Sequence, residues 1–303
     1  MMKIGFGTFC SDAHSRMSTN HTLRLQNLNF DKLFKVFLMN LDDLFKLLDL
    51  CKSENIQVFR LGSSFIPFAS HDNFKEKWLY NLEPLLLEAG ERIKREYNIR
   101  ITMHPGQFVV LNSLNEAVVD RTLRELQYHF WLLDRLGIGE DGVVIVHVGG
   151  VYEAKQRAID RFIDTVEKNS WLKRRLAVEN DENLFNAQDV LQISQTLKIP
   201  FVFDYFHHTL NHSEISLKEV FETWGSAMTP KVHLSSSREG EHGLHGDFIR
   251  IEDFINLWNI LSQTGIDKVH IMIEAKKKEL AIRRLRKELT KLPPTDAILK
   301  TIV

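Results

Sequence analysis

The chain has 303 residues, of which 44% are hydrophobic and 26% are charged, and its formal net charge is −1. This composition is typical of a soluble globular protein and argues against binding polyanions through overall charge. No run of about 20 apolar residues is present to span a membrane, and the chain begins with a strand-like segment instead of a signal peptide. With only Cys10 and Cys51, it has too few cysteines for a disulfide framework. We therefore expect a cytoplasmic monomer without membrane association.

Short β-branched or aromatic runs alternate with amphipathic segments along the chain. Strands are predicted at 2–9, 56–64, 98–104, 141–149, 175–180, 199–205, 230–235 and 268–274. Helical spacing of apolar residues is clearest at Leu33, Phe37, Leu41, Leu44 and Leu48, and at Phe254, Leu257, Trp258 and Leu261. Eight strand and helix pairs without a linker predict a single (β/α)8 TIM barrel over residues 1–303. An open doubly wound sheet is the alternative.

The signature of a nucleotide-binding open sheet is incomplete. Gly5 and Gly7 follow the first strand with the expected spacing, but Cys10 stands where the third glycine belongs. The sequence also has no Gly-x-x-x-x-Gly-Lys motif. We therefore expect no nucleotide cofactor.

Histidines and carboxylates stand at the ends of six consecutive predicted strands. They are His104, His147, Glu179, Asp204, His233 and Glu274, and His207 and His208 follow directly after the sixth strand. The carboxyl ends of barrel strands converge on one rim, where these groups would bury unpaired charge unless cations sat among them. Imidazole and carboxylate without thiolate suit manganese, zinc, iron or magnesium. So many ligands predict more than one ion.

Lys231 shares a strand face with His233, because residues two apart on a strand point to the same side. Burial next to cations disfavours the protonated amine, so Lys231 is expected to be neutral or chemically modified. His270 is interpreted as a packed core residue, and His14, His21, His129 and His212 as structural residues. His208 is either a ligand or a neighbour of one.

The end of the chain is basic. Residues 276–303 contain nine Lys or Arg and three Asp or Glu. This pattern indicates either a solvated outer face of the last helix or an edge that faces DNA.

The motifs and their order resemble the UV damage endonucleases, TIM-barrel repair enzymes related in fold and metal chemistry to endonuclease IV and xylose isomerase-like proteins. The resemblance covers nearly the whole chain. It rests on the segments at 60–64 with Pro67 and His71, 104–108, 146–150, 179–181, 204–208, 231–235, 245–247 and 272–276.

The resemblance implies that two or three divalent ions, most often Mn²⁺ with Zn²⁺ or Mg²⁺ as alternatives, are bound in one cluster. The implied ligands are His71, His104, His147, Glu179, Asp204, His207, His233, His245 and Glu274. Lys231 matches a lysine that family members carry in N-carboxylated form. The predicted catalytic residues are Lys231, Glu179 and Glu274.

The resemblance further implies that Gln107 and Phe108 probe the duplex at the damaged step, with phenylalanine in place of the family's tyrosine. Phe6 likewise replaces a tyrosine at the lesion, and Cys10 replaces an asparagine. Arg238 is predicted to bind DNA, and Arg24 and the lysines at 276–278 are further candidates for phosphate contacts.

The implied substrate is damaged double-stranded DNA. The expected reaction is hydrolysis of the phosphodiester 5′ to UV photoproducts or other distorting lesions. Two alternatives remain, a metal-dependent sugar isomerase or epimerase and a damage-binding protein without catalysis.

Overall fold

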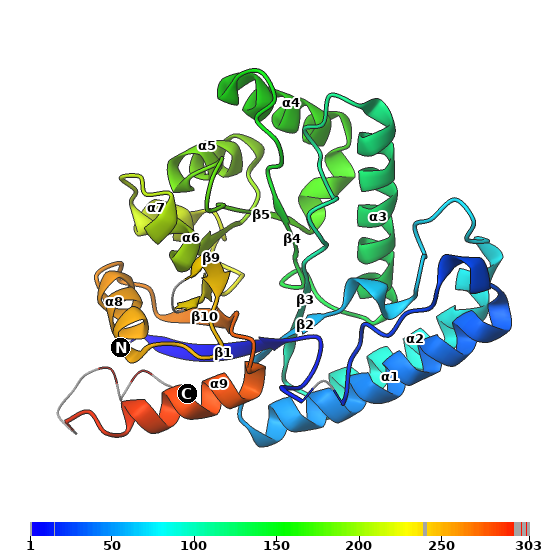
Figure 1. The fold of residues 1–303 in the computed structure, drawn as a ribbon, viewed down its shortest axis with the longest axis horizontal. Helices are drawn as coiled ribbons and strands as arrows, with labels where there is room; N and C mark the ends of the chain where they lie inside the picture. Colours follow the sequence, from blue (N-terminus) through cyan, green and yellow to red (C-terminus); the bar gives the residue numbers. More distant parts are fainter. Residues whose placement is uncertain (1, 15, 239–240, 294–297, 299–300, 302–303) are drawn as a thin grey trace.

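Eight parallel strands close into a barrel in the computed structural model, which describes residues 2–14, 16–238, 241–293, 298 and 301 (Figure 1). The order around the barrel is β1, β2, β3, β4, β5, β6, β7 and β10. Their bounds are β1 Lys3–Phe9, β2 Val58–Leu61, β3 Arg100–Met103, β4 Val144–His147, β5 Leu176–Glu179, β6 Phe201–Asp204, β7 Lys231–Leu234 and β10 Lys268–Ile273. Each lies within a predicted strand, so the TIM-barrel prediction is confirmed and the open sheet is excluded.

Helices form the layer outside the strands (Figure 1). They are α1 Phe30–Ser53, α2 Lys77–Glu96, α3 Glu116–Arg135, α4 Lys155–Lys168, α5 Ala187–Leu197, α6 Tyr205–Leu210, α7 Leu217–Glu222, α8 Ile251–Ser262 and α9 Lys278–Leu289. Short 3-10 turns lie at Leu25–Asn27, Ser63–Phe65 and Ser170–Arg174. Helix α1 begins where the Asn29 side chain accepts a hydrogen bond from the Lys32 amide, and it buries the predicted apolar stripe through Leu33 and Phe37.

The strand β1 turns its glycines toward the barrel interior. A Cβ on Gly5 would lie 2.8 Å from the His270 ring, and one on Gly7 would lie 3.0 Å from the Met272 side chain. Because side chains alternate along a strand, Phe6 points outward and packs against Phe254 of α8, with ring centroids 5.9 Å apart. Phe6 has no exposed surface, so the prediction that it contacts the lesion is wrong.

An antiparallel hairpin follows β7 and was not predicted from the sequence. It pairs β8 (Ser237–Arg238) with β9 (Glu241–His245). The hairpin lies beyond the carboxyl end of β7, so it brings His245 to the rim that the barrel strands share.

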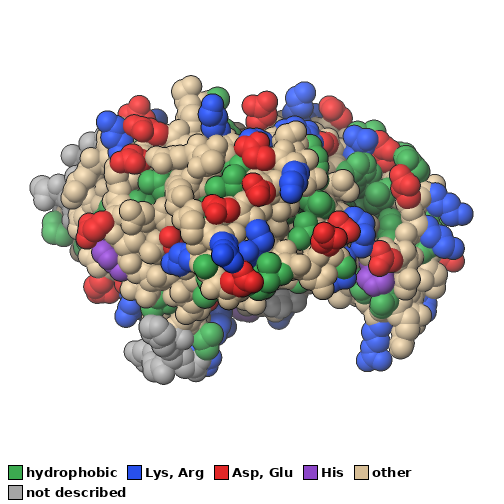
Figure 2. All heavy atoms as spheres, turned by 90° about the horizontal axis from the view of Figure 1, so that it is seen from above, with side chains coloured by type: hydrophobic (Ala, Val, Ile, Leu, Met, Phe, Trp, Pro, Cys, Tyr) green, Lys and Arg blue, Asp and Glu red, His purple; other side chains and the backbone are tan. Residues whose placement is uncertain are grey.

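The basic residues of α9 are largely paired at the other end of the barrel. Arg283 forms an ion pair with Glu54, and Arg286 donates to the backbone carbonyls of Glu54 and Asn55. These partners precede β2, at the amino ends of the strands, so this part of the basic segment is an outer face of the protein. Acidic and basic side chains are also interspersed over the face shown in Figure 2. Among the described residues, no helix has the length and apolarity needed to cross a membrane.

Candidate metal centre

Six neighbouring strands deliver histidines and carboxylates to the same rim. His147, Glu179 and Asp204 are the last residues of β4, β5 and β6. His233 lies in β7, while His104 and Glu274 directly follow β3 and β10. Strand register places His147 beside Glu179 and Asp204 beside His233. The fold therefore brings together residues separated by up to 170 positions in the sequence.

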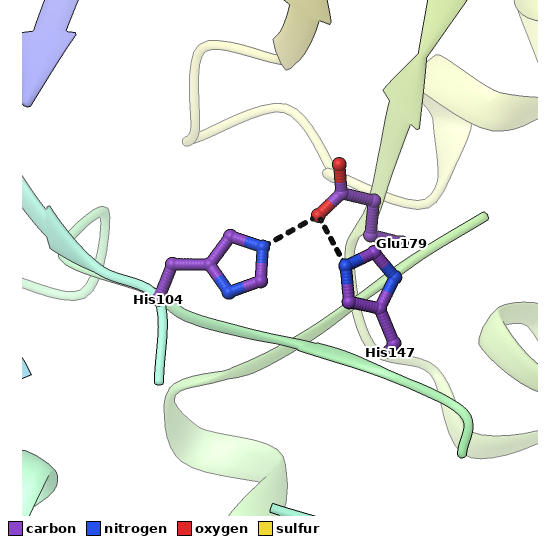
Figure 3. A group of neighbouring side chains, drawn as sticks. All are labelled: His104, His147 and Glu179. Carbon is purple, nitrogen blue, oxygen red and sulfur yellow. Dashed lines mark hydrogen bonds and ion pairs between the residues drawn. The ribbon is translucent and has the colours of Figure 1, made fainter. Parts of the chain in front are cut away.

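The carboxylate of Glu179 is the centre of this group (Figure 3). Its Oε2 lies 2.8 Å from His104 Nε2 and 3.7 Å from His147 Nε2. Its Oε1 lies 2.6 Å from His233 Nδ1 and 4.0 Å from His207 Nδ1. Burial raises the pKa of Glu179, but the charges of His233 and His147 and the hydrogen bonds from His104 and His233 outweigh burial and hold this pKa well below its usual range.

The ring of His104 is oriented to offer a lone pair to a cation. Its Nδ1 lies 3.2 Å from the Pro105 carbonyl, and its Nε2 lies 2.8 Å from the Glu179 carboxylate. In the tautomer that donates from Nδ1 to the carbonyl, Nε2 has no proton and can bind a cation. Burial lowers the pKa of His104, so a second proton on this ring is disfavoured. A cation bound by Nε2 and by the Glu179 carboxylate would replace the hydrogen bond between them.

A second set of donors surrounds Asp204. Ligand atoms of Glu179, Asp204 and His233 lie within 4.8 Å of one another, as do those of His104, His147 and Glu179. Asp204 Oδ2 is buried without a hydrogen-bond partner. Burial raises the pKa of Asp204 to about 7, and the neighbouring carboxylates of Glu179 and Glu274 add to the effect. A buried carboxylate with an orphan oxygen and a set of N and O donors fits divalent ions.

His207 and His245 extend the donor set toward solvent. His207 Nδ1 lies 3.0 Å from the Asn180 carbonyl, so it carries the proton and Nε2 is the nitrogen able to bind a metal. His245 Nδ1 lies 3.9 Å from Glu274 Oε2, and the rings of His207 and His245 are 6.1 Å apart. Asn180 is buried and fixes Asp204 through two backbone hydrogen bonds of 3.0 and 2.9 Å.

Arg60 is a member of the site that sequence reasoning missed. It projects from β2 and forms an ion pair with Glu274 Oε1, and its Nη2 lies 3.1 Å from His233 Nε2. Burial raises the pKa of Glu274, but Arg60 and then His233 reverse this and hold the pKa well below its usual range. Its position in a motif shared with the family was the only signal in the sequence.

Lys231 is fully buried in the barrel below the rim, as the strand alternation predicts. Its amine donates to Thr102 Oγ1 at 3.0 Å. Burial, followed by the charges of Arg60 and Arg100, lowers the pKa of Lys231 well below its usual value. The interpretation that this amine is not an ordinary ammonium group agrees with these surroundings.

Several other histidines lie apart from the cluster. His71 is exposed on the loop after β2, packs its ring against Phe68 and accepts from the Asn73 amide, so its role as a ligand stays a prediction. His208 packs against Phe203 and His212, and neither donor group of the described residues includes it. His270 is buried, and its Nδ1 lies 3.3 Å from Arg100 Nη1 at the opposite end of the barrel.

The predicted probing pair stands on an exposed turn beside the centre. Phe108 is 69% exposed, the largest exposed fraction among the large hydrophobic side chains of the described residues. It lines a pocket of about 600 Å³ together with His71, whereas Gln107 lines one of about 480 Å³ together with His147. A Cβ on Gly106 would lie 2.8 Å from the Phe108 ring, so a larger residue there would shift this ring.

The candidates for phosphate contacts differ in their surroundings. Arg24, Arg238 and Lys276 are exposed. The Lys278 amine is instead held by Ser11 Oγ and the Asp12 carbonyl. Of the lysine run, Lys276 is therefore the residue most accessible to a phosphate.

The protein is a (β/α)8 barrel that gathers histidines and carboxylates into a candidate metal centre at its rim. A family model for the UV-endonuclease UvdE matches residues 9–303. A UV DNA damage endonuclease of Bacillus cereus (strain G9842) is 35% identical over 93% of this chain and 90% of its own length. The homologue from Bacillus mycoides (strain KBAB4) is 34% identical, over 93% and 91% of the two chains. The chain belongs to the UV-endonuclease UvdE family, and the resemblance found in the sequence is confirmed.

Solved structures support the same assignment. The crystal structure of SacUVDE is 35% identical, with a TM-score of 0.85 over 96% of this chain and 99% of that one. The 3-keto-D-glucoside 4-epimerase YcjR from E. coli matches with a TM-score of 0.56 at 14% identity, over 96% and 100% of the chains. Such low identity shows a shared barrel fold alone.

Proposed function

We propose that this protein is a DNA repair endonuclease that cuts the phosphodiester on the 5′ side of UV photoproducts and other distorting lesions. The observation that carries the proposal is the convergence of four histidines on Glu179, one of which, His104, precedes the exposed Phe108 by four residues. Family membership supports the activity, and the geometry supports a metal-dependent form of it.

The positions of the donor atoms suggest which residues would bind each ion. His104, His147 and Glu179 would hold one, and Glu179, Asp204 and His233 with Glu274 would hold another. His207 and His245 would complete a third position, and Mn²⁺ is the expected metal. Divalent ions at such a centre supply Lewis acidity and neutralise charge on the scissile phosphate.

The remaining residues position these groups and the substrate. Asn180 fixes the proton of His207 on Nδ1, and Arg60 orients Glu274. Phe108 offers an aromatic face on which a base can stack, and Gln107 offers an amide beside it. A damaged step is already partly unstacked, so opening it costs less than opening an intact step, and this difference provides selectivity.

The test compares UV-irradiated and untreated supercoiled DNA in the presence of Mn²⁺. Nicking confined to the irradiated plasmid is expected, and chelation of the metal should abolish it. Glu274→Gln and His104→Ala should each slow nicking by at least about 100-fold, because each removes a charged or ligating group from the centre. Glu219→Gln, which changes an exposed carboxylate on α7, is the matched control and should retain full activity.

The outcomes also separate the alternatives. Equal nicking of both plasmids, or unchanged nicking by His104→Ala, would reject lesion-specific cleavage at this centre. Retarded migration of irradiated DNA without strand breaks would instead indicate a damage-binding protein. Turnover of a ketose in the same buffer would indicate a sugar isomerase.

A further inference from the structure

A second pocket lies at the end of the barrel opposite the metal centre. Its volume is about 370 Å³. Its polar wall is built from residues at or just before the first residues of the strands, including Gln57, Arg100, Asp141, Thr229 and Lys268. We call it the basal pocket. Neither the family assignment nor the proposed reaction gives it a role.

Arg100, the first residue of β3, is buried in the wall of the basal pocket with only 3% of its side chain exposed. Its Nε donates to the Asp141 carbonyl at 2.7 Å, and its Nη1 donates to the Thr229 carbonyl at 2.6 Å. Its Nη2 is buried and has no hydrogen-bond partner. The guanidinium therefore places a buried and incompletely compensated positive charge in the wall of the pocket, which favours an anion there.

His270 provides a second donor at the same place. Its Nδ1 lies 3.3 Å from Arg100 Nη1, and because arginine only donates, this nitrogen accepts. The proton of the neutral ring is therefore on Nε2. Among the described residues, no partner is recorded for this N–H, and His270 lines the pocket.

The charges of the basal pocket favour an anion. Among the described residues that line it, Lys94, Arg100 and Lys268 are basic and Asp141 is the one acidic residue. The Asp141 carboxylate lies 3.9 Å from Arg100 Nε and is 49% exposed, so it compensates the buried charge only weakly. Tyr97 and Leu136 add apolar surface to the same wall.

We propose that the basal pocket binds a small phosphomonoester, with its phosphate at Arg100, His270 and Lys268 and its organic part against Tyr97 and Leu136. A phosphate offers several acceptors for these donors and matches their charge. The pocket is larger than a phosphate ion needs, and its apolar wall suits an attached ring. The alternative is that Arg100 only clamps the loops that carry Asp141 and Thr229.

The test is calorimetric titration of the complete, metal-loaded protein with phenyl phosphate and with inorganic phosphate at constant ionic strength. Phenyl phosphate should bind roughly fivefold or more tightly than inorganic phosphate, because only its ring uses the apolar wall. Lys268→Glu should weaken binding of phenyl phosphate at least about fivefold through lost attraction and added repulsion. Lys268 is exposed, so this variant is expected to fold.

Two controls make the result specific. Lys218→Glu changes an exposed lysine outside the basal pocket and should bind phenyl phosphate as the wild type does. His104→Ala should also retain this binding while it loses nicking, which separates the basal pocket from the metal centre. Equal affinities for the two ligands, no binding, or equal losses in Lys268→Glu and Lys218→Glu would overturn the proposal. The clamp alternative predicts no binding of either anion.

Discussion

Four histidine rings surround the carboxylate of Glu179, and this side chain has only 1% of its surface exposed. Glu179→Gln keeps the shape of the side chain but removes its negative charge, and Glu179 belongs to both candidate groups of metal ligands. We expect nicking of irradiated DNA to fall by about 100-fold or more. We also expect fewer Mn²⁺ ions per chain, measured by elemental analysis after gel filtration. Full metal content with full activity would contradict the shared role of Glu179.

Phe108 exposes its ring to solvent, although burial of an aromatic side chain is favourable. Such exposure is expected of a ring that stacks on a DNA base in the complex. Phe108→Ala should reduce the preference for irradiated over untreated DNA by about 10-fold, because stacking on an aromatic ring contributes about 1–3 kcal/mol per base. Phe108→Tyr should keep the preference. The measurement is binding of a duplex with and without one cyclobutane dimer, and an unchanged ratio for Phe108→Ala would argue against a probing role.

Individual residues show both the strength and the limit of sequence reasoning. His104, His147, Glu179 and Asp204 could be identified because strand ends of a parallel barrel meet at one rim. Arg60 was missed because its partner Glu274 is 214 positions away and belongs to another strand. Phe6 was placed at the lesion by the resemblance alone, although its alternation with Gly5 and Gly7 puts its side chain on the outer face of β1.

At the scale of elements, helix α1 anchors two rim loops through Asn40. This buried amide donates to the carbonyls of His21, Ser64 and Phe65 and accepts from the His21 amide at 2.8 Å. Asn40→Ala leaves these buried groups unpaired, so it should lower the free energy of unfolding by about 2–4 kcal/mol. Urea unfolding measures this loss. Asn259→Ala on the exposed face of α8 is the matched control, and an equally small effect of both variants would contradict the anchoring role.

The elements themselves differed in how far they could be predicted. Parallel strands covered on both faces appear as continuous apolar runs, which made all eight barrel strands recognisable. The β8–β9 hairpin was missed because its segment is short and polar and lacks such a run. The two strands of this hairpin pair because of their position at the rim, and a local sequence pattern does not indicate that position. The hairpin nevertheless carries the predicted ligand His245.

For the whole molecule, the buried His270 predicts how stability depends on pH. Burial, and then the charges of Arg100 and Lys268, lower the pKa of His270 from its usual value of 6.5 to about 3. Between these values the unfolded chain binds a proton that the folded chain does not bind. The free energy of unfolding should therefore fall as the pH decreases from 6.5 toward 3, by up to about 1.4 kcal/mol per pH unit from this residue.

Urea unfolding at several pH values between 6.5 and 4 checks this prediction. His270→Gln removes the titrating ring and keeps a side-chain acceptor for Arg100. The variant should lose stability less steeply on acidification than the wild type. Equal slopes for the two proteins would show that His270 titrates normally in the folded protein.

The central claim is that the rim of this barrel holds divalent ions that cut DNA at a lesion. The most direct measurement uses an end-labelled duplex with one cyclobutane dimer and maps the cut at nucleotide resolution with Mn²⁺ and with a chelator. We predict one cut at the phosphodiester immediately 5′ to the dimer, dependent on Mn²⁺ and absent from the undamaged duplex. Cutting elsewhere, cutting of the undamaged duplex, or cutting in the presence of the chelator would contradict the account.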